Sequence, residues 1–198
     1  MNLGLHDRVV VVGAPRSEDR EACHATLDAE VAACVTVDML SDVDGVIRAT
    51  LNTHGRIDGV VMFLPFAPSS SVLETTAEEL SEAWASVEEV AAGFRAATHP
   101  MTEQHYGRLI SVVTGSVKWL NDEVDELGVI AGLGVLGLHK AAVADVAQFG
   151  IAANAVLRDS DADDSEVAST VAFLLSESAG YLQGVTISLD GAKSSAVF

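Results

Sequence analysis

The side chains that could do chemistry in this chain stand just after its apolar runs. Thr114 and Ser116 follow the run 108–113, and Arg158 follows the run 151–157. Such runs predict strands of a parallel sheet, and open parallel sheets bind ligands beyond the carboxyl ends of their strands. The sequence therefore predicts a pocket at that edge, lined by Phe66, Thr114, Ser116, Trp119 and Arg158.

The two cations near this edge have alternative roles. Arg158 could hold a carboxylate or phosphate group of a ligand, or it could form a salt bridge with Asp159 or Asp161. Lys118 could imitate a hydroxyl–lysine pair with Thr114, although closeness in sequence gives no geometry. The salt bridge is the favoured role of Arg158, and catalysis by Lys118 and Thr114 has little support.

No metal site is predicted. Cys23 and Cys34 are the only cysteines, and neither has a second Cys or a His cluster at metal-ligand spacing. Two cysteines are too few for a disulfide framework, so the expected location is a reducing cytoplasm. His99 and His105 have no carboxylate clearly placed to orient them, and we expect both at the surface.

The charge of the chain argues against one class of partner. The chain carries 29 Asp and Glu against 11 Lys and Arg, a formal net charge of −18. Such an acidic protein repels phosphate backbones and anionic membranes, so neither nucleic acid nor a membrane is expected as a partner. The acidity could reflect a salt-rich cytoplasm, or it could only keep a hydrophobic chain in solution.

The apolar run Val129–Leu138 is shorter than the ~20 residues of a membrane span and predicts a buried helix.

Alternating strands and helices must position the predicted pocket. Apolar runs predict strands at 9–13, 31–37, 57–64, 108–113, 151–157 and 185–189. Helices are predicted from Ser17 onward and at 41–54, 76–98, 129–148 and 165–177. This alternation indicates an α/β fold in one domain over residues 1–198: a Rossmann-like, doubly wound sheet of six parallel strands in the order 2-1-3-4-5-6. Five carboxylates within 158–166 predict a solvated loop.

The two longest helices carry a candidate interface. The helix 76–98, which Pro100 is expected to end, has an apolar stripe that could anchor a partner or simply pack on the core. In the helix 129–148, we expect Gly132 and Gly137 to allow close packing and Gly128 to lie in a frayed start, since each glycine weakens a helix by ~1 kcal/mol. An oligomer, homo- or hetero-, is expected. The candidate interface consists of Leu80, Trp84, Val87, Ala91, Phe94, Gly132, Leu136 and Gly137.

Several segments resemble the short-chain dehydrogenase/reductase superfamily, in particular its ketoacyl-reductase-like members. Residues 55–61 resemble the strand before the family's Asn-Asn-Ala-Gly motif, and residues 107–110 resemble the strand that carries its catalytic Ser. Residues 150–156 are similar to its sixth-strand signature, and pieces of 166–191 are similar to its last helix and strand. The likeness covers 55–191 in register. It implies a Rossmann-like fold, and an interface between subunits formed by the two long helices.

The cofactor cradle of the resembled family is altered in this chain. A Gly-rich turn after the first strand holds a dinucleotide pyrophosphate in the family, whereas residues 13–19 here read Gly-Ala-Pro-Arg-Ser-Glu-Asp. A proline removes one amide donor, and two carboxylates stand where an anion would bind. One strand–helix unit that holds the adenosine ribose is missing, and Asp38 lacks the neighbours of the family's adenine-contacting aspartate. The bulky Met62–Pro65 replaces Asn-Asn-Ala-Gly, so no cofactor is predicted.

The resemblance also places the catalytic tetrad on residues that lack its chemistry. The Tyr and Lys positions fall on Gly128 and Gly132, the Ser position on Thr114, and the Asn position, within one residue, on Ser86. Hydride transfer in the family needs a phenol acid beside a lysine. No catalytic residue is therefore assigned, and the substrate-covering loop is shortened to 158–164.

Three hypotheses for the function follow. The leading one is a non-catalytic subunit that uses the retained helices to pair with an active paralogue of the same superfamily. The second is a cofactor-independent lyase, isomerase or cyclase that binds an apolar ligand in the vacated cleft, near Met62–Pro65. The third, with the least support, is an NAD(P)H-dependent oxidoreductase with rearranged motifs.

Overall fold

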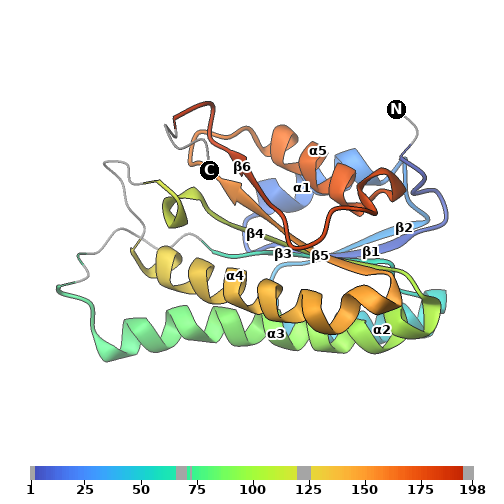
Figure 1. The fold of residues 1–198 in the computed structure, drawn as a ribbon, viewed down its shortest axis with the longest axis horizontal. Coiled ribbons are helices and arrows are strands. Elements are labelled where there is room, and N and C mark those ends of the chain that lie inside the picture. Colours follow the sequence, from blue (N-terminus) through green and yellow to red (C-terminus); the bar gives the residue numbers. More distant parts are fainter. Residues whose placement is uncertain (1–2, 66–70, 72, 120–125, 194–198) are drawn as a thin grey trace.

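A six-stranded parallel sheet forms the centre of the computed structural model, which describes residues 3–65, 71, 73–119 and 126–193 (Figure 1). The strand order is β2-β1-β3-β4-β5-β6, and every pairing between neighbours is parallel. The predicted strand order is therefore confirmed. The strands are β1 (Val9–Gly13), β2 (Ala33–Val37), β3 (Gly59–Phe63), β4 (Gly107–Thr114), β5 (Ile151–Arg158) and β6 (Thr186–Leu189).

Helices cover both faces of the sheet, as the α/β prediction requires (Figure 1). One face carries α1 (Ser17–Leu27) and α5 (Asp164–Leu175), and the other carries α2 (Val43–His54), α3 (Ala77–Gln104) and α4 (Glu126–Val146). Short 3-10 turns are η1 (Leu40–Asp42), η2 (Gly115–Val117), η3 (Ala147–Phe149) and η4 (Glu177–Ala179). A single helix connects β1 to β2, as the sequence predicts.

The continuous apolar strands explain why both faces are buried. Successive side chains of a strand point to opposite faces of a sheet. Val9 and Val11 accordingly belong to the hydrophobic cluster under α2, α3 and α4, whereas Val10 and Val12 belong to the cluster under α1 and α5. An alternating strand would have left one face polar, so the apolar runs identify a sheet covered on both sides.

The end of α3 differs from the prediction. The sequence predicts an end at Thr98, before Pro100, but Pro100 is buried inside the helix, which continues to Gln104. A proline removes one helical hydrogen bond. Met101 is buried against Gly107, where an added Cβ would be 2.5 Å from the Met101 Sδ atom. This packing of the last turn against β4 outweighs the missing hydrogen bond.

The glycines of α4 have different surroundings. Gly128 is buried inside the helix, which begins at Glu126, so the expected frayed start is wrong. A Cβ at Gly132 would be 2.7 Å from Cγ1 of Val117, so glycine lets α4 approach η2 closely. A Cβ at Gly137 would meet no atom within 4 Å. Nothing in the described part of the chain therefore requires glycine at position 137.

The outer side of α4 is open, which corrects the expectation of a buried helix. Its inner side packs on the sheet, but Leu133, Gly137 and Ala141 are exposed. Continued through η3, α4 is the one described helix that is long and apolar enough to cross a membrane, and 28% of its most apolar stretch is buried. A single helix of this kind is weak support for a membrane span, because helices that cover a core pass the same test.

Candidate functional site

The carboxyl ends of β4 and β5 bring together four of the predicted pocket residues. Thr114 and Arg158 are register partners on the two strands, and Ser116 and Trp119 follow in and after η2. All four side chains are buried. The Thr114 hydroxyl accepts a hydrogen bond from the Ser116 amide at 3.3 Å. Phe66 lies outside the described residues.

Trp119 fills the space above the end of β4. A Cβ at Gly115 would be 1.9 Å from Cζ2 of the indole, so the ring lies directly on this glycine. The indole Nε1 donates a hydrogen bond to Oδ2 of Asp159 at 3.1 Å. The indole is 9% exposed as a result, and it closes the edge of the sheet between β4 and β5.

Arg158 holds a buried ion-pair network between α1, β5 and α5. Its Nη1 donates to Asp19 in the first turn of α1, and its Nη2 donates to Asp164 at the start of α5. Arg16 Nη1 lies 3.7 Å from Oδ1 of each of these carboxylates. The side chains of Arg158 and Asp19 are each 4% exposed. Two segments that are far apart in the chain are therefore joined by one guanidinium.

These contacts correct two expectations from the sequence. Arg158 pairs with Asp19 and Asp164 instead of Asp159 or Asp161, because Asp159 is held on the other side by Trp119 and Lys193. Arg158 and Asp159 are each 3% exposed, so the predicted solvated loop 158–166 is wrong for its first two residues. Asp19 at the start of α1 was the sequence signal for this cation, whereas its neighbour Glu18 is exposed.

The turn between β1 and α1 does not fit a dinucleotide pyrophosphate. Phosphate binding at a helix N-terminus needs open amide donors and positive potential. Here the first turn of α1 carries Glu18 and the buried Asp19, whose carboxylate is taken by Arg158. Gly13 is packed from behind, because an added Cβ would be 2.9 Å from Cγ2 of Val43. Arg20 Nη1 donates to the carbonyl groups of this turn, at 3.0 Å for Pro15.

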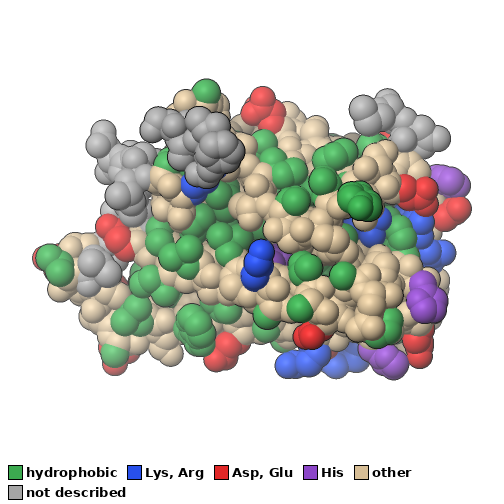
Figure 2. All heavy atoms as spheres, in the orientation of Figure 1, with side chains coloured by type: hydrophobic (Ala, Val, Ile, Leu, Met, Phe, Trp, Pro, Cys, Tyr) green, Lys and Arg blue, Asp and Glu red, His purple; other side chains and the backbone are tan. Residues whose placement is uncertain are grey.

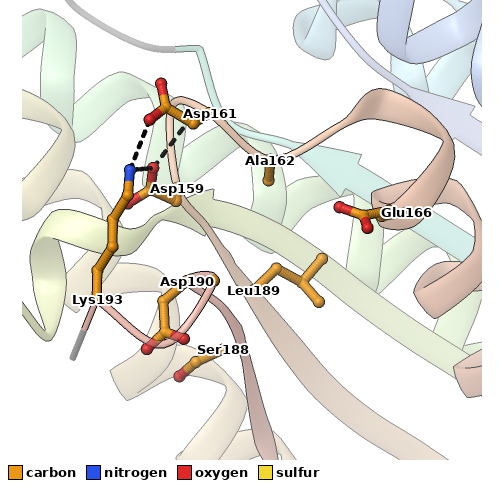
Figure 3. A pocket seen from close by; sticks show the side chains of 9 residues that line it. Asp159, Asp161, Ala162, Glu166, Ser188, Leu189, Asp190 and Lys193 are labelled. Atoms are coloured by element: carbon orange, nitrogen blue, oxygen red, sulfur yellow. Dashed lines mark hydrogen bonds and ion pairs between the residues drawn. The ribbon is translucent and has the colours of Figure 1, made fainter. Parts of the chain in front are cut away.

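A cavity of about 350 Å³ lies beyond the carboxyl ends of β5 and β6 (Figure 3). Lys193 Nζ lies 2.6 Å from Asp159 Oδ1 and 2.7 Å from Asp161 Oδ2 (Figure 3). Burial alone would raise the pKa of Asp159, but hydrogen bonds from Lys193, the Asp161 amide and Trp119 outweigh it and lower this pKa. The lining residues are Asp159, Asp161, Ala162, Glu166, Ser188, Leu189, Asp190, Gly191 and Lys193.

No site was predicted at these lining residues. Their signal was the run of carboxylates at 158–166, which we interpreted as a solvated loop. The cavity suits cationic groups, because Lys193, the one cation among its described lining residues, is already held by two carboxylates. Within the described ranges, no three His, Cys, Asp or Glu side chains are arranged to hold a metal ion.

Lys193→Met should raise the pKa of Asp159, because it removes the ammonium that donates to this buried carboxylate. Trp119 donates to the same carboxylate and reports its titration by fluorescence. The loss of stability should be small, since Lys193 is 43% exposed and Trp119 and the Asp161 amide still donate to Asp159. Lys118→Met is the matched control, because Lys118 is exposed and donates to Ser188 instead. An acid midpoint of Trp119 fluorescence that is equal in both variants would contradict the assignment.

The residues at the predicted tetrad positions lie in packed surroundings. Ser86 is half-buried in α3, and Gly128 and Gly132 are buried in α4. Thr114 is at the end of β4, and a side chain larger than hydrogen at position 132 would collide with Val117. The arrangement leaves no room for a lysine at position 132 without movement of η2.

The candidate interface residues divide into two groups. Val87, Phe94 and Gly132 are buried in this chain, whereas Leu80, Trp84 and Gly137 are exposed. Ala91 and Leu136 are half-buried. The open members lie on the outer face of α3 and α4, which we call the α3–α4 face.

A buried contact between His139 and Ser111 was not predicted. His139 Nε2 and Ser111 Oγ lie 2.8 Å apart, and the His139 ring packs edge-on against Phe94 at a centroid distance of 5.1 Å. Nδ1 of this ring is buried and has no hydrogen-bond partner among the described residues. Burial lowers the pKa of His139 to about 4. One histidine inside an apolar helix gives no sequence signal that separates it from a surface residue.

Comparisons with known proteins identify the fold. No family model matches the chain, and no curated protein matches it in sequence. A short-chain dehydrogenase from Mycobacterium smegmatis is similar in structure, with a TM-score of 0.81 and 21% identity over 98% of this chain and 95% of that chain. Levodione reductase matches with a TM-score of 0.80 and 20% identity over 97% and 99% of the two chains.

Acetoin dehydrogenase from Enterobacter cloacae matches with a TM-score of 0.81 and 17% identity over 93% of this chain and 95% of that chain. Identities at this level show the fold alone. The chain therefore has the Rossmann-like fold of short-chain dehydrogenases/reductases, which confirms the fold that the resemblance implies.

Proposed function

We propose that this chain is a non-catalytic protein with the short-chain dehydrogenase/reductase fold, and that it works as a cytoplasmic subunit beside an active paralogue. The observation that carries the proposal is the Arg158 network at the carboxyl edge of the sheet. In the resembled family this edge, next to the turn after β1, is where a dinucleotide binds. Here Asp19 and Arg158 neutralise each other in that region and are buried.

The tetrad positions support the same proposal. Gly128 and Gly132 stand where the family carries Tyr and Lys, so the resemblance provides neither a phenol acid nor an ammonium to lower its pKa. The close approach to Val117 also favours glycine over any larger residue at position 132. A return of the family chemistry would thus need changes in η2 as well as at the two glycines.

The open α3–α4 face supports a role in assembly. A helix that is apolar nearly all round is stable when both sides are covered, and the outer side of α4 is exposed in this chain. Trp84 is 52% exposed on the neighbouring α3, and tryptophan is typical of interface anchors. We infer that another subunit covers this face.

The second candidate, a cofactor-independent enzyme in the vacated cleft, has less support. It needs an open apolar cleft near Met62 and Phe63, but these side chains are 0% and 3% exposed. Thr114 and Ser116 are buried and bonded to each other. The apolar segment that motivates this candidate belongs to the core of the protein. The third candidate, a cofactor-dependent oxidoreductase, has the least support.

Calorimetric titration of the purified chain with NADH and NADPH tests the loss of cofactor binding. We expect no heat of binding for either, because an added pyrophosphate would displace Arg158 from Asp19 and face two carboxylates. A micromolar dissociation constant for either dinucleotide would overturn the proposal.

Gentle purification from the native host tests the assembly, with an active reductase of the same superfamily as the expected companion. Recovery of this chain only with itself would contradict the pairing.

A further inference from the structure

We propose that the outer edge of β2 binds an extended segment of another protein as an added strand, and that this segment is an apolar run with Lys or Arg at both ends. The inference concerns a different surface from the α3–α4 face and goes beyond the proposed pairing with a paralogue. It follows from the backbone groups, the side chains and the charges along β2.

β2 is the last strand on one side of the sheet. Among the described residues it pairs only with β1, in a register that runs without a bulge from Ala33 opposite Val9 to Val37 opposite Gly13. The strand at the opposite edge is β6 (Figure 1). Figure 2 shows the side of the molecule that carries β6 and α4, over which hydrophobic side chains are spread. The edge of β2 is therefore a separate surface.

Two residues of β2 direct their backbone groups away from the sheet. The Val37 carbonyl accepts a hydrogen bond from the Ala14 amide at 3.0 Å, so Val37 directs its backbone groups toward β1. Successive residues of a strand alternate in this direction, so Cys34 and Thr36 direct their amide and carbonyl groups outward. These groups are the donors and acceptors to which an added strand bonds.

The side chains of β2 favour an apolar partner strand. Ala33 and Val35 pack on the cluster under α2, α3 and α4, whereas Cys34 packs on the cluster under α1 and α5, and all three are half-buried. A strand added beside them would extend both clusters if its central residues are apolar and β-branched. The run Ala33–Val37 also has no charge and no proline, which natural edge strands use to prevent such pairing.

Carboxylates at both ends of β2 define the charge of the partner. Asp28 and Glu30 precede the strand, and Asp38 and Asp42 follow it. Glu30 is half-buried and the other three are exposed, with Asp28 Oδ1 at 3.7 Å from Nε2 of His24. Acidic groups at both ends attract a segment that carries Lys or Arg at both of its ends.

The same carboxylates disfavour a second copy of this chain as the occupant. Whether two β2 strands pair parallel or antiparallel, the acidic ends of one strand lie beside the acidic ends of the other. This local repulsion adds to that between two chains whose net charge is −18 each. The carboxylates thus keep copies of the chain apart and select a basic partner.

The opposite edge of the sheet is less suited to such a segment. β6 is four residues long, and Thr186 at its start is exposed. Lys118 Nζ donates a hydrogen bond to Ser188 Oγ of this strand at 3.2 Å, which places an ammonium group on β6. A basic segment would be repelled there.

Fluorescence anisotropy with a labelled peptide tests the proposal on the full chain. The peptide has a run of Val, Ile and Thr as long as β2, with a pair of lysines at each end. We expect binding that weakens as salt is added, and a peptide with glutamates in place of the lysines should bind about 10-fold more weakly. Slower amide exchange at Cys34 and Thr36 should accompany binding. Failure of the lysine peptide to bind at concentrations up to about 1 mM would overturn the inference.

Thr36→Pro tests whether the backbone of this edge makes the contact. It removes an outward amide and leaves the hydrogen bonds to β1, because proline is tolerated on an edge strand where its nitrogen faces away from the sheet. The lysine peptide should bind about 10-fold more weakly to Thr36→Pro, whereas Thr36→Val keeps the amide and should bind it as wild type does. Circular dichroism checks that both variants are folded. Equal affinity of folded Thr36→Pro and wild type would contradict the proposal.

A charge reversal tests the ends of β2 without a change in its backbone. Asp28→Lys combined with Asp38→Lys should reverse the preference between the lysine and glutamate peptides. Glu103→Lys combined with Asp145→Lys is the matched control, because these exposed carboxylates lie on α3 and α4. An unchanged preference in the first double variant would overturn the inference, and so would self-association of wild type that Thr36→Pro abolishes. Each of these outcomes leaves the proposed function standing, since that depends on dinucleotide binding and the paralogue.

Discussion

Arg158→Met should lower the free energy of unfolding by about 3 to 5 kcal/mol, the range expected when one partner of a buried ion pair is removed. The substitution leaves Asp19 buried, with only the half-exposed Arg16 nearby at 3.7 Å. It also removes the ion pair that ties Asp164, at the start of α5, to this network. Urea denaturation followed by circular dichroism measures the change.

Two further variants separate the buried charge from simple packing. Arg16→Met should change stability by less than about 1 kcal/mol, because Arg16 is 40% exposed and its ion pairs are long. Asp19→Leu combined with Arg158→Met should recover part of the loss, since no buried charge is then left alone. A double variant that is no more stable than Arg158→Met would show that the packing of the arginine side chain, and not its charge, makes the contribution to stability.

Acidification should destabilise the protein through His139, by about 3 kcal/mol between pH 6.5 and about 4. Burial lowers the pKa of His139 in the folded state, so the unfolded chain binds a proton first as the pH falls below 6.5. Above pH 6.5 both states hold a neutral ring and this stability is fully present. Below about pH 4 both states are protonated and the loss is complete. Urea midpoints across this range measure the effect.

His139→Gln isolates this contribution from the titration of the many carboxylates. Glutamine can still bond to Ser111 but does not titrate. The difference in free energy of unfolding between wild type and variant would be independent of pH only if His139 played no part. We expect a difference that changes steadily between pH 6.5 and about 4. His99→Gln is the matched control, because its side chain is 83% exposed. Parallel pH curves for wild type and His139→Gln would refute the prediction.

The fold could be predicted from the sequence because the strands carry their own signal. Runs such as residues 9–13 and 59–63 are apolar without alternation, and this pattern is typical of strands in a sheet covered on both faces. Turn glycines such as Gly55, with φ of 73°, mark helix ends independently of the rest of the fold. The end of α3 at Gln104 could not be predicted, because it depends on the burial of Met101 against β4.

The candidate site was predicted only in part. Thr114 and Arg158 lie at one edge of the sheet because each ends a strand and the two strands pair in register. The partner of Arg158 was missed, since Asp19 is separated from it by 139 positions in the chain and no local pattern joins them. The acidic cavity was missed for a similar reason. Lys193 forms ion pairs with Asp159 and Asp161 of the cavity, but it comes from a different segment of the chain.

The Arg158 network also has a consequence for synthesis on the ribosome. Asp19 emerges from the exit tunnel long before Arg158, 139 positions later, is translated. Until then the nascent chain must keep this carboxylate hydrated, because burying it without a counter-ion is unfavourable. Stable docking of α1 therefore awaits the last fifth of translation. Truncated chains that stop before β5 should remain open and sensitive to proteases, and a large share of native contacts should form only after release.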